Sequence, residues 1–425
     1  MARVLYWFRT DLRLHDSPAL DAALQLKPAA FFPIWCWDPQ VLSPFVRLGF
    51  FSVAHVISYS MSFIRVWART AFSSCSFCIA CESSLHSDLL GRLDCQNNLS
   101  ENITKLNKKS KLFVLRASPQ DILPILFKQW KITHLVFEKD TCEYARRRDT
   151  EVKAAAKKAG VEVVDVHGHS LYDPELVIKA NKGKAPLTYN HYLDIVAKMP
   201  KVPAPIPAPT SLPDPGDTTL DVKRQDVPVN TTPDLNANWR VKYDSCFEHV
   251  KGPKGDFAIT TLDEMGMDEA TTPHKGGEDL ALERMAAYLK EKVKVAKFEK
   301  PKTSPADFLP PSTTLLSPHL KFGALSPRLL YHEVHRVMKE VGHGTKPPVS
   351  LDGQLLWRDF YYAAALGTPN FDRIRGNPVS RFIDWKLLDQ YSADGKLLDR
   401  RPDEEGEERY RRWEEGTTVF DVNKW

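Results

Sequence analysis

The sequence is short of cysteine, of excess charge and of long apolar runs, and each shortage excludes a class of protein. Seven cysteines in 425 residues are few and odd in number, which excludes a disulfide-stapled extracellular scaffold and favours a reducing compartment with mostly free thiols. Lys+Arg number 58 against 54 Asp+Glu, a net charge of +4, which permits a nucleic-acid partner without demanding one. With 43% apolar and 26% charged residues, the composition is that of an ordinary globular chain.

Targeting and membrane signals are also missing. The opening residues MARVLYWFRT pass from one short apolar run to charged side chains, so the apolar core of a secretory signal is absent. The most apolar stretch, residues 48–64, contains His55 and is flanked by Arg47 and Arg65, whereas a membrane span needs about 20 apolar residues. We therefore expect a chain that is neither secreted nor inserted in a membrane, located in the nucleus or the cytoplasm.

The first third of the chain alternates short apolar runs with helical patterns. The runs predict buried strands at residues 2–8, 30–37, 111–116, 134–138 and 161–166, and the helices between them begin near residues 17, 119 and 142. Strands separated by helices form a parallel sheet covered on both faces, and such sheets bind ligands beyond the carboxyl ends of their strands. No GxGxxG pattern follows any of these strands, so the usual dinucleotide-binding fingerprint is missing.

Two segments break this rhythm. Residues 43–91 are rich in Ser, Phe and Cys without a clear period, which predicts an irregular insert. They contain Cys75, Cys78 and Cys81, half of an iron–sulfur motif, but the fourth Cys and its following Pro are missing, so we favour chance clustering and expect no metal site. Residues 171–275 contain KVPAPIPAPTSLPDPG, a composition typical of a surface connector.

From residue 276 onward the pattern becomes helical. A helix predicted over residues 278–298 carries lysines at positions 290, 292, 294 and 297. This basic face could contact phosphate groups. A solvated helix end that complements the helix dipole explains the same lysines more simply, and we favour it.

A cluster of hydroxyl side chains lies in the segment PPSTTLLSPHLKFGALSP. Ser317 and Ser326 each precede a proline, the pattern of a helix N-cap followed by proline in the first turn. Thr313 and Thr314 add two hydroxyls just before the first of these helices, and Lys300 lies upstream. Hydroxyls and free N–H groups at a helix N-terminus can bind an anion such as a pyrophosphate, although plain helix capping accounts for the same residues.

A polar and aromatic row follows in the segment LDGQLLWRDFYYAAALG. Gln354, Trp357, Arg358 and Tyr361 stand at i, i+3, i+4 and i+7 and therefore share one helix face. An amide, an indole, a guanidinium and a phenol can bond to and stack on a planar heterocycle or a flipped base. The alternative is an ordinary aromatic core, and local chemistry does not decide between the two.

Several of these segments together resemble the photolyase/cryptochrome family. They are WFRTDLRLHDSPAL, SKLFVLRASPQDILP, FEKPKTSPADFLPPSTTLLSPHLKFGALS, GQLLWRDFYY and PNFDRIRGNPVSRFIDW. Gln354 in GQLLWR, with the FEKPKTSP and PNFDRIRGNP segments, is similar to the eukaryotic (6-4) photolyases and animal-type cryptochromes. Photolyases that act on cyclobutane dimers commonly carry Glu in place of that Gln.

The resemblance implies an α/β Rossmann-like N-terminal domain over residues 1–170, a connector over 171–275, and a partial all-α FAD-binding domain over 276–425. The implied function is blue-light-driven, FAD-dependent repair of photolesions in UV-damaged DNA by a monomer, with a second antenna chromophore of unidentified type. A cryptochrome that signals without repairing DNA is the first alternative. A fragment with only its α/β domain competent, and an unrelated nucleotide-binding enzyme, are the others.

The resemblance also assigns roles to individual residues. The phosphates and ribityl chain of FAD would be lined by Lys300, Thr313, Thr314, Leu316 and Ser317. Gln354 and Arg358 would lie at the flavin cavity. Trp357 would stack near the lesion, and the substrate side would also include Gln354 and Tyr361. Trp385 matches the outer tryptophan of the electron-transfer chain that photoreduces the flavin.

The chain departs from the family pattern in two places. The family continues for a long stretch beyond its WxxGxTG segment, whereas here Trp413 and Gly416 are soon followed by the last residue, Trp425. The two inner tryptophans and the two histidines of (6-4) repair have no counterpart, and residues 43–91 replace the segment around the antenna pocket. We therefore expect an incomplete helical domain that folds poorly alone, without its catalytic histidines.

Overall fold

The computed structural model describes residues 1–38, 76–222, 247–265, 275–304, 311–371, 376–379 and 381, with the side chains of 76–88 excepted. Two compact units divide the chain. The first contains residues 1–43 and 89–367, and the second contains residues 44–88 and 368–425. Trp385, the stretch 48–64 and Cys75 lie outside the described residues.

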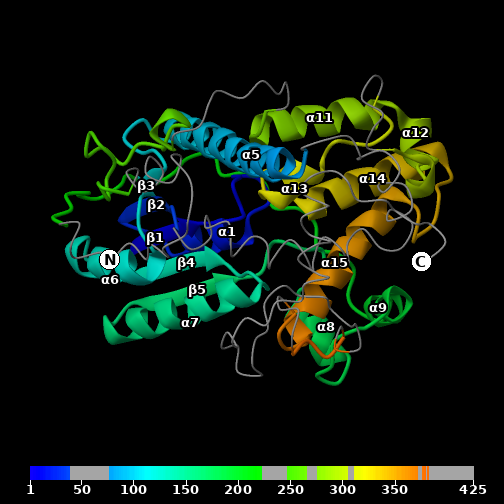
Figure 1. Cartoon of the computed structure of the whole chain (residues 1–425), viewed down its shortest axis with the longest axis horizontal. Coiled ribbons are helices and arrows are strands. Elements are labelled where there is room, and N and C mark those ends of the chain that lie inside the picture. The colour runs from blue at the N-terminus through cyan, green and yellow to red at the C-terminus, as the bar shows by residue number, and fades with distance from the viewer. Residues whose placement is uncertain are drawn as a thin grey trace, which may run out of the picture. The chain divides into compact units, whose positions relative to one another are not determined.

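A five-stranded parallel sheet forms the centre of the first unit (Figure 1). Its strands are β1 (Arg3–Phe8), β2 (Ala30–Cys36), β3 (Phe113–Leu115), β4 (His134–Glu138) and β5 (Glu162–Val166), in the spatial order β3-β2-β1-β4-β5. All four strand pairs are parallel. Every residue of β2 is buried, as expected when helices cover both faces of a sheet. The predicted parallel sheet is therefore confirmed.

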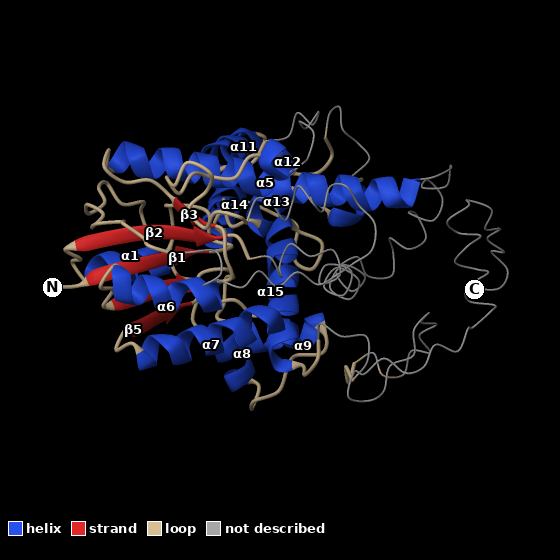
Figure 2. Cartoon of the chain, turned by 60° about the vertical axis from the view of Figure 1, so that its left-hand side comes forward, coloured by secondary structure: helices blue, strands red, loops and turns tan. Residues whose placement is uncertain are grey.

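The crossover helices are α1 (Pro18–Gln25), α6 (Pro119–Gln129) and α7 (Glu143–Lys158). Ser17 caps α1, because its hydroxyl accepts from the Leu20 amide at 3.2 Å. Helices α6 and α7 pack on each other, and α1 packs against β4 and β5. Figure 2 shows the strands running side by side between these helices. The polar loops that follow the strands therefore gather at one edge of the sheet.

The core of this α/β part is aromatic. Trp7, Phe32 and Trp130 are almost fully buried, and the rings of Phe32 and Trp130 stack with centroids 5.1 Å apart. Phe257, from the segment that we predicted to be a connector, packs edge-on against Trp130 at 5.9 Å. Part of that segment therefore belongs to the core.

Residues 171–275 contain more regular structure than the prediction allowed. They form α8 (Pro174–Ala180), α9 (Tyr189–Val196) and the short 3-10 helix η2 (Asp263–Met265). Both α8 and α9 contact α15 (Leu351–Gly367) (Figure 1). The proline-rich composition concealed α9, whose buried Tyr189 and Tyr192 lie three residues apart and so share a face.

The helical part also corrects two expectations. Its elements are α5 (Ser76–Leu106), α11 (Glu278–Lys290), α12 (Lys292–Ala296), the 3-10 helix η3 (Lys300–Lys302), α13 (Ser317–Lys321), α14 (Pro327–Val341) and α15. The single helix predicted over 278–298 breaks at Glu291, whose ψ of 59° is not helical. Helix α5 begins inside the segment predicted to be irregular. Within the described part of the chain, no helix is long and apolar enough to cross a membrane.

Candidate functional site

The hydroxyl segment before α13 folds as a tight turn rather than as a capped helix start. Thr314 accepts from the Leu316 amide through Oγ1 at 3.2 Å, and Leu315 lies in the left-handed region with φ of 57°. Ser317 is the first helical residue, and the cap position falls on Leu316 without a side-chain bond. The predicted capping role of Ser317 is therefore wrong. Ser326 does cap its helix, accepting from the amides of Arg328 and Leu329.

The Lys300 turn lies beside this segment. Ser312 joins the two, because its hydroxyl accepts from the Ser304 amide at 2.8 Å and lies 2.9 Å from the Ser304 carbonyl oxygen. Lys300 is half-buried, and burial lowers the pKa of its ammonium group. Thr313 and Thr314 are also half-buried, whereas Ser317 is exposed. The structure therefore brings an ammonium group and two hydroxyls into neighbouring turns, a set that suits a phosphorylated ligand.

The predicted row on α15 shares one helix face, but most of its members already contact protein. Trp357 stacks on Tyr189 of α9, with ring centroids 4.0 Å apart and planes 3° apart. Gln354 donates from Nε2 to the Pro348 carbonyl oxygen at 3.0 Å. Tyr361 lies 5.9 Å from Trp357, centroid to centroid. Trp357 and Tyr361 are half-buried, so the row is part packing surface and part accessible.

Arg358 ties α15 to two other segments. Its guanidinium donates to the His169 carbonyl oxygen at 2.6 Å, to Nε2 of the same histidine at 2.8 Å and to the Leu320 carbonyl oxygen of α13 at 3.3 Å. Since a guanidinium can only donate, Nε2 of His169 must accept, and its ring proton therefore sits on Nδ1. Burial and the nearby Arg358 hold the pKa of His169 well below its usual range. The contact with Leu320 brings α15 against the helix that follows the hydroxyl segment.

Polar side chains at the carboxyl ends of β1 and β4 form a buried network that our sequence analysis did not name. Arg13 donates to Glu138 at 3.3 Å and to the Gly323 carbonyl oxygen at 3.0 Å. Burial raises the pKa of Glu138, although Arg13 opposes this. Arg9 forms an ion pair with Asp149 at 2.6 Å. Charged residues directly after buried strands were the available signal, because loops at that edge of a parallel sheet converge.

Asp359 is a buried carboxylate that anchors α15 to the loop after β5. Its Oδ2 accepts from the amides of Leu171 at 2.7 Å and Tyr172 at 3.0 Å. Burial raises its pKa to about 7, and the neighbouring Arg358 and these two amides offset only part of that shift. A buried carboxyl at this junction makes the stability of the fold depend on pH.

We predict that Asp359→Asn flattens this dependence. The folded pKa lies above the usual value of 3.8, so the stabilising contribution is complete below about pH 4 and is lost as the pH rises toward 7. The free energy of unfolding of the parent chain should fall relative to the variant by up to about 1.4 kcal/mol per pH unit in that window. Urea unfolding at a series of pH values measures it, and parallel curves for the two proteins would contradict the prediction.

Comparison with known proteins identifies a family. The family model described as DNA photolyase matches residues 4–58 and 90–210. The (6-4)DNA photolyase of Arabidopsis thaliana is 33% identical over 387 residues, which cover 90% of this chain and 58% of the relative. That of Oryza sativa subsp. japonica is 35% identical over 391 residues, covering 90% and 60%. Cryptochrome-1 of Rattus norvegicus is 34% identical over 419 residues, covering 98% and 56%.

Solved structures share the fold at lower identity. A cryptochrome from Synechocystis sp. PCC6803 has a TM-score of 0.52 at 21% identity, with 86% of this chain and 62% of that chain covered. A class III photolyase from Agrobacterium tumefaciens has the same TM-score at 18% identity, with 86% and 59% covered. The chain spans little more than half the length of the curated relatives that it matches. From these matches and the α/β sheet with its helical partner, the chain belongs to the photolyase/cryptochrome family, on the branch of the eukaryotic (6-4) photolyases and animal cryptochromes.

Proposed function

We propose that this chain binds FAD and serves blue-light-driven repair of (6-4)-type photolesions in DNA. UV-damaged DNA is the proposed partner, a monomer the proposed state, and the nucleus or cytoplasm the proposed location. Family membership supports this reading. The observation that carries it is the junction between the two predicted halves of the cofactor site, where Arg358 of α15 bonds to the Leu320 carbonyl oxygen of α13.

The donor set of the hydroxyl segment fits the phosphate groups of FAD. An ammonium group in a partly dry position and half-buried hydroxyls are the donors that a pyrophosphate needs. Lys300, Thr313 and Thr314 would hold it, with Leu316 and Ser317 beside them. When bound, FAD would supply light absorption and the electron that passes to the lesion, because the cofactor carries the difficult chemistry and the protein positions it. An antenna chromophore stays part of the proposal without an assigned site.

Residues of α15 would form the wall next to the reacting groups. Trp357 is held flat by its stack with Tyr189, which fixes the plane against which a flipped base could lie. Gln354 and Tyr361 would offer an amide and a phenol on the same side. The bonds of Arg358 to His169 and Leu320 support a positioning role, in which it keeps α15 and α13 at a constant separation.

Binding of FAD to the purified chain tests the proposal. We expect Lys300→Ala to weaken FAD binding at least tenfold, since a charge-assisted bond contributes about 1.5–3 kcal/mol. Lys302→Ala is the matched control, because Lys302 is an exposed lysine of the same turn that is paired with Glu299. Quenching of flavin fluorescence measures both. Absence of binding to the parent chain, or equal losses in the two variants, would exclude the proposed phosphate site.

A cryptochrome-type photoreceptor is the second candidate, favoured by the match of Cryptochrome-1 to 98% of the chain. The two candidates differ in what happens to a lesion. An oligonucleotide that carries one (6-4) photoproduct is incubated with the FAD-loaded chain and a reductant under blue light, and the restored bases are measured. Restoration supports repair. Photoreduction of the flavin without restoration supports the photoreceptor.

A further inference from the structure

Strand β5 leaves one edge of the sheet open among the described residues. It is the last strand in the spatial order and pairs only with β4. On the β4 side, the Glu162 amide donates to the Thr133 carbonyl oxygen at 2.9 Å, and the Val166 carbonyl oxygen accepts from the Lys139 amide at 2.8 Å. Because backbone groups alternate along a strand, the N–H and C=O groups of Val163 and Asp165 point to the open side.

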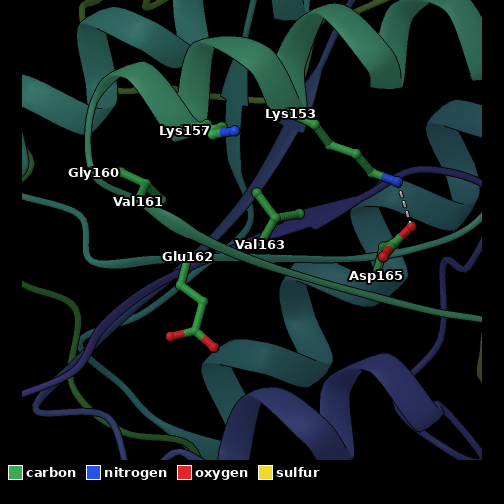
Figure 3. A pocket seen from close by; sticks show the side chains of 7 residues that line it. All are labelled: Lys153, Lys157, Gly160, Val161, Glu162, Val163 and Asp165. Atoms are coloured by element: carbon green, nitrogen blue, oxygen red, sulfur yellow. Dashed lines mark hydrogen bonds and ion pairs between the residues drawn. The ribbon is translucent and has the colours of Figure 1, made fainter.

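A groove runs along this open edge, between β5 and α7 (Figure 3). Its volume is about 470 Å³, and it is lined by Lys153, Lys157, Gly160, Val161, Glu162, Val163 and Asp165. Val161 is buried and Val163 half-buried, so the floor is apolar. The opening therefore combines unpaired backbone groups with an apolar strip, which are the two features that an added strand uses.

The charges around the groove leave one cation unpaired on the side of α7. Lys153 bonds to Asp165 at 2.6 Å, the contact drawn as a dashed line in Figure 3. Glu162 points to the opposite face of the strand (Figure 3), where it lies 3.4 Å from His134. Lys157 is exposed and makes no ion pair with any described residue. An incoming segment would therefore be matched best by an acidic side chain facing α7.

We propose that the open edge of β5, with the facing side of α7, docks an extended acidic peptide segment of a partner protein. Val163 and Asp165 would pair with its backbone, Val163 would contact an apolar side chain, and Lys157 would face its carboxylate. Charged side chains normally protect an edge strand, but Asp165 is neutralised by Lys153 and so does not repel an acidic segment. The inference is independent of cofactor binding.

A short fluorescein-labelled peptide of alternating valine and threonine, with one central glutamate, is the probe. We expect saturable binding to the full chain by fluorescence anisotropy, together with slower hydrogen exchange at the amides of Val163 and Asp165. Lys157→Glu should weaken binding about tenfold and favour a matched peptide with lysine at its centre. Lys158→Glu is the control, because this neighbouring lysine is exposed but does not line the groove, and it should change binding less than twofold.

A second variant tests the backbone pairing. Val163→Pro removes an amide that the ladder with β4 does not use, a place where an edge strand accepts proline, and it should abolish binding while the β4–β5 pairing remains. Equal losses in the two lysine variants, binding that survives Val163→Pro, or no binding of the glutamate peptide would each overturn the proposal. Sedimentation that shows the chain dimerising through β5 would overturn it as well, because a second copy would then be the occupant.

Discussion

Gly323→Ala is expected to destabilise the first compact unit by about 4 kcal/mol or more, at the upper end of single-residue effects. Gly323 has φ of 71°, a region that costs an L-residue roughly 1–2 kcal/mol. A Cβ at this position would also lie 1.8 Å from the Thr10 carbonyl oxygen, which is backbone and cannot rotate away. The neighbouring Leu12 amide bonds to the Phe322 carbonyl oxygen at 3.3 Å, so the turn after α13 would have to separate from the loop after β1.

Gly342→Ala is the matched control for this effect. Gly342 ends α14 with φ of 83°, but a Cβ there would meet nothing within 4 Å. It should therefore lose only the roughly 1–2 kcal/mol of the left-handed conformation. Urea unfolding followed by circular dichroism compares the two variants. Similar losses would mean that the approach of Gly323 to Thr10 contributes nothing beyond backbone strain.

The sheet could be predicted from the sequence because parallel strands buried on both faces are short, purely apolar runs. His134–Glu138 was predicted with its observed bounds, and the other strands differ at their ends by one or two residues. Helix α9 was not predicted, since its two buried tyrosines lie between proline-rich segments whose composition dominates the local pattern. Glu291 likewise carries no breaker signal, so the end of α11 could not be foreseen.

The candidate site was only partly predictable, because periodicity places residues on a face but does not name their partners. The shared face of Gln354, Trp357, Arg358 and Tyr361 follows from helix geometry. That Trp357 stacks on Tyr189, and that Arg358 bonds to His169, depends on segments far away in the sequence. Ser317 and Ser326 show the same limit, since both precede proline but only Ser326 caps its helix.

Asp16→Asn is expected to destabilise the fold by about 3–5 kcal/mol, the usual loss when one partner of a buried ion pair is removed. The Asp16 carboxylate accepts from Arg328 at 2.5 and 3.1 Å and from the Ile206 amide at 2.8 Å. The Ser326 hydroxyl also donates to it. Both Asp16 and Arg328 are more than nine-tenths buried. Asparagine tolerates the positive φ of 44° at this position, so the loss would report the charge and the reversed donor rather than the backbone.

A double-mutant cycle separates the pair from its surroundings. Arg328→Met alone leaves the Asp16 carboxylate with only Ile206 and Ser326, and it should also destabilise strongly. The double variant removes both charges together, so its loss should be smaller than the sum of the single losses by about 1–3 kcal/mol. Arg336→Met is the control, because Arg336 pairs with Glu333 on the exposed side of α14 and such pairs contribute little. Additive losses at Asp16 and Arg328 would show that the two side chains stabilise the junction of β1 and α14 separately.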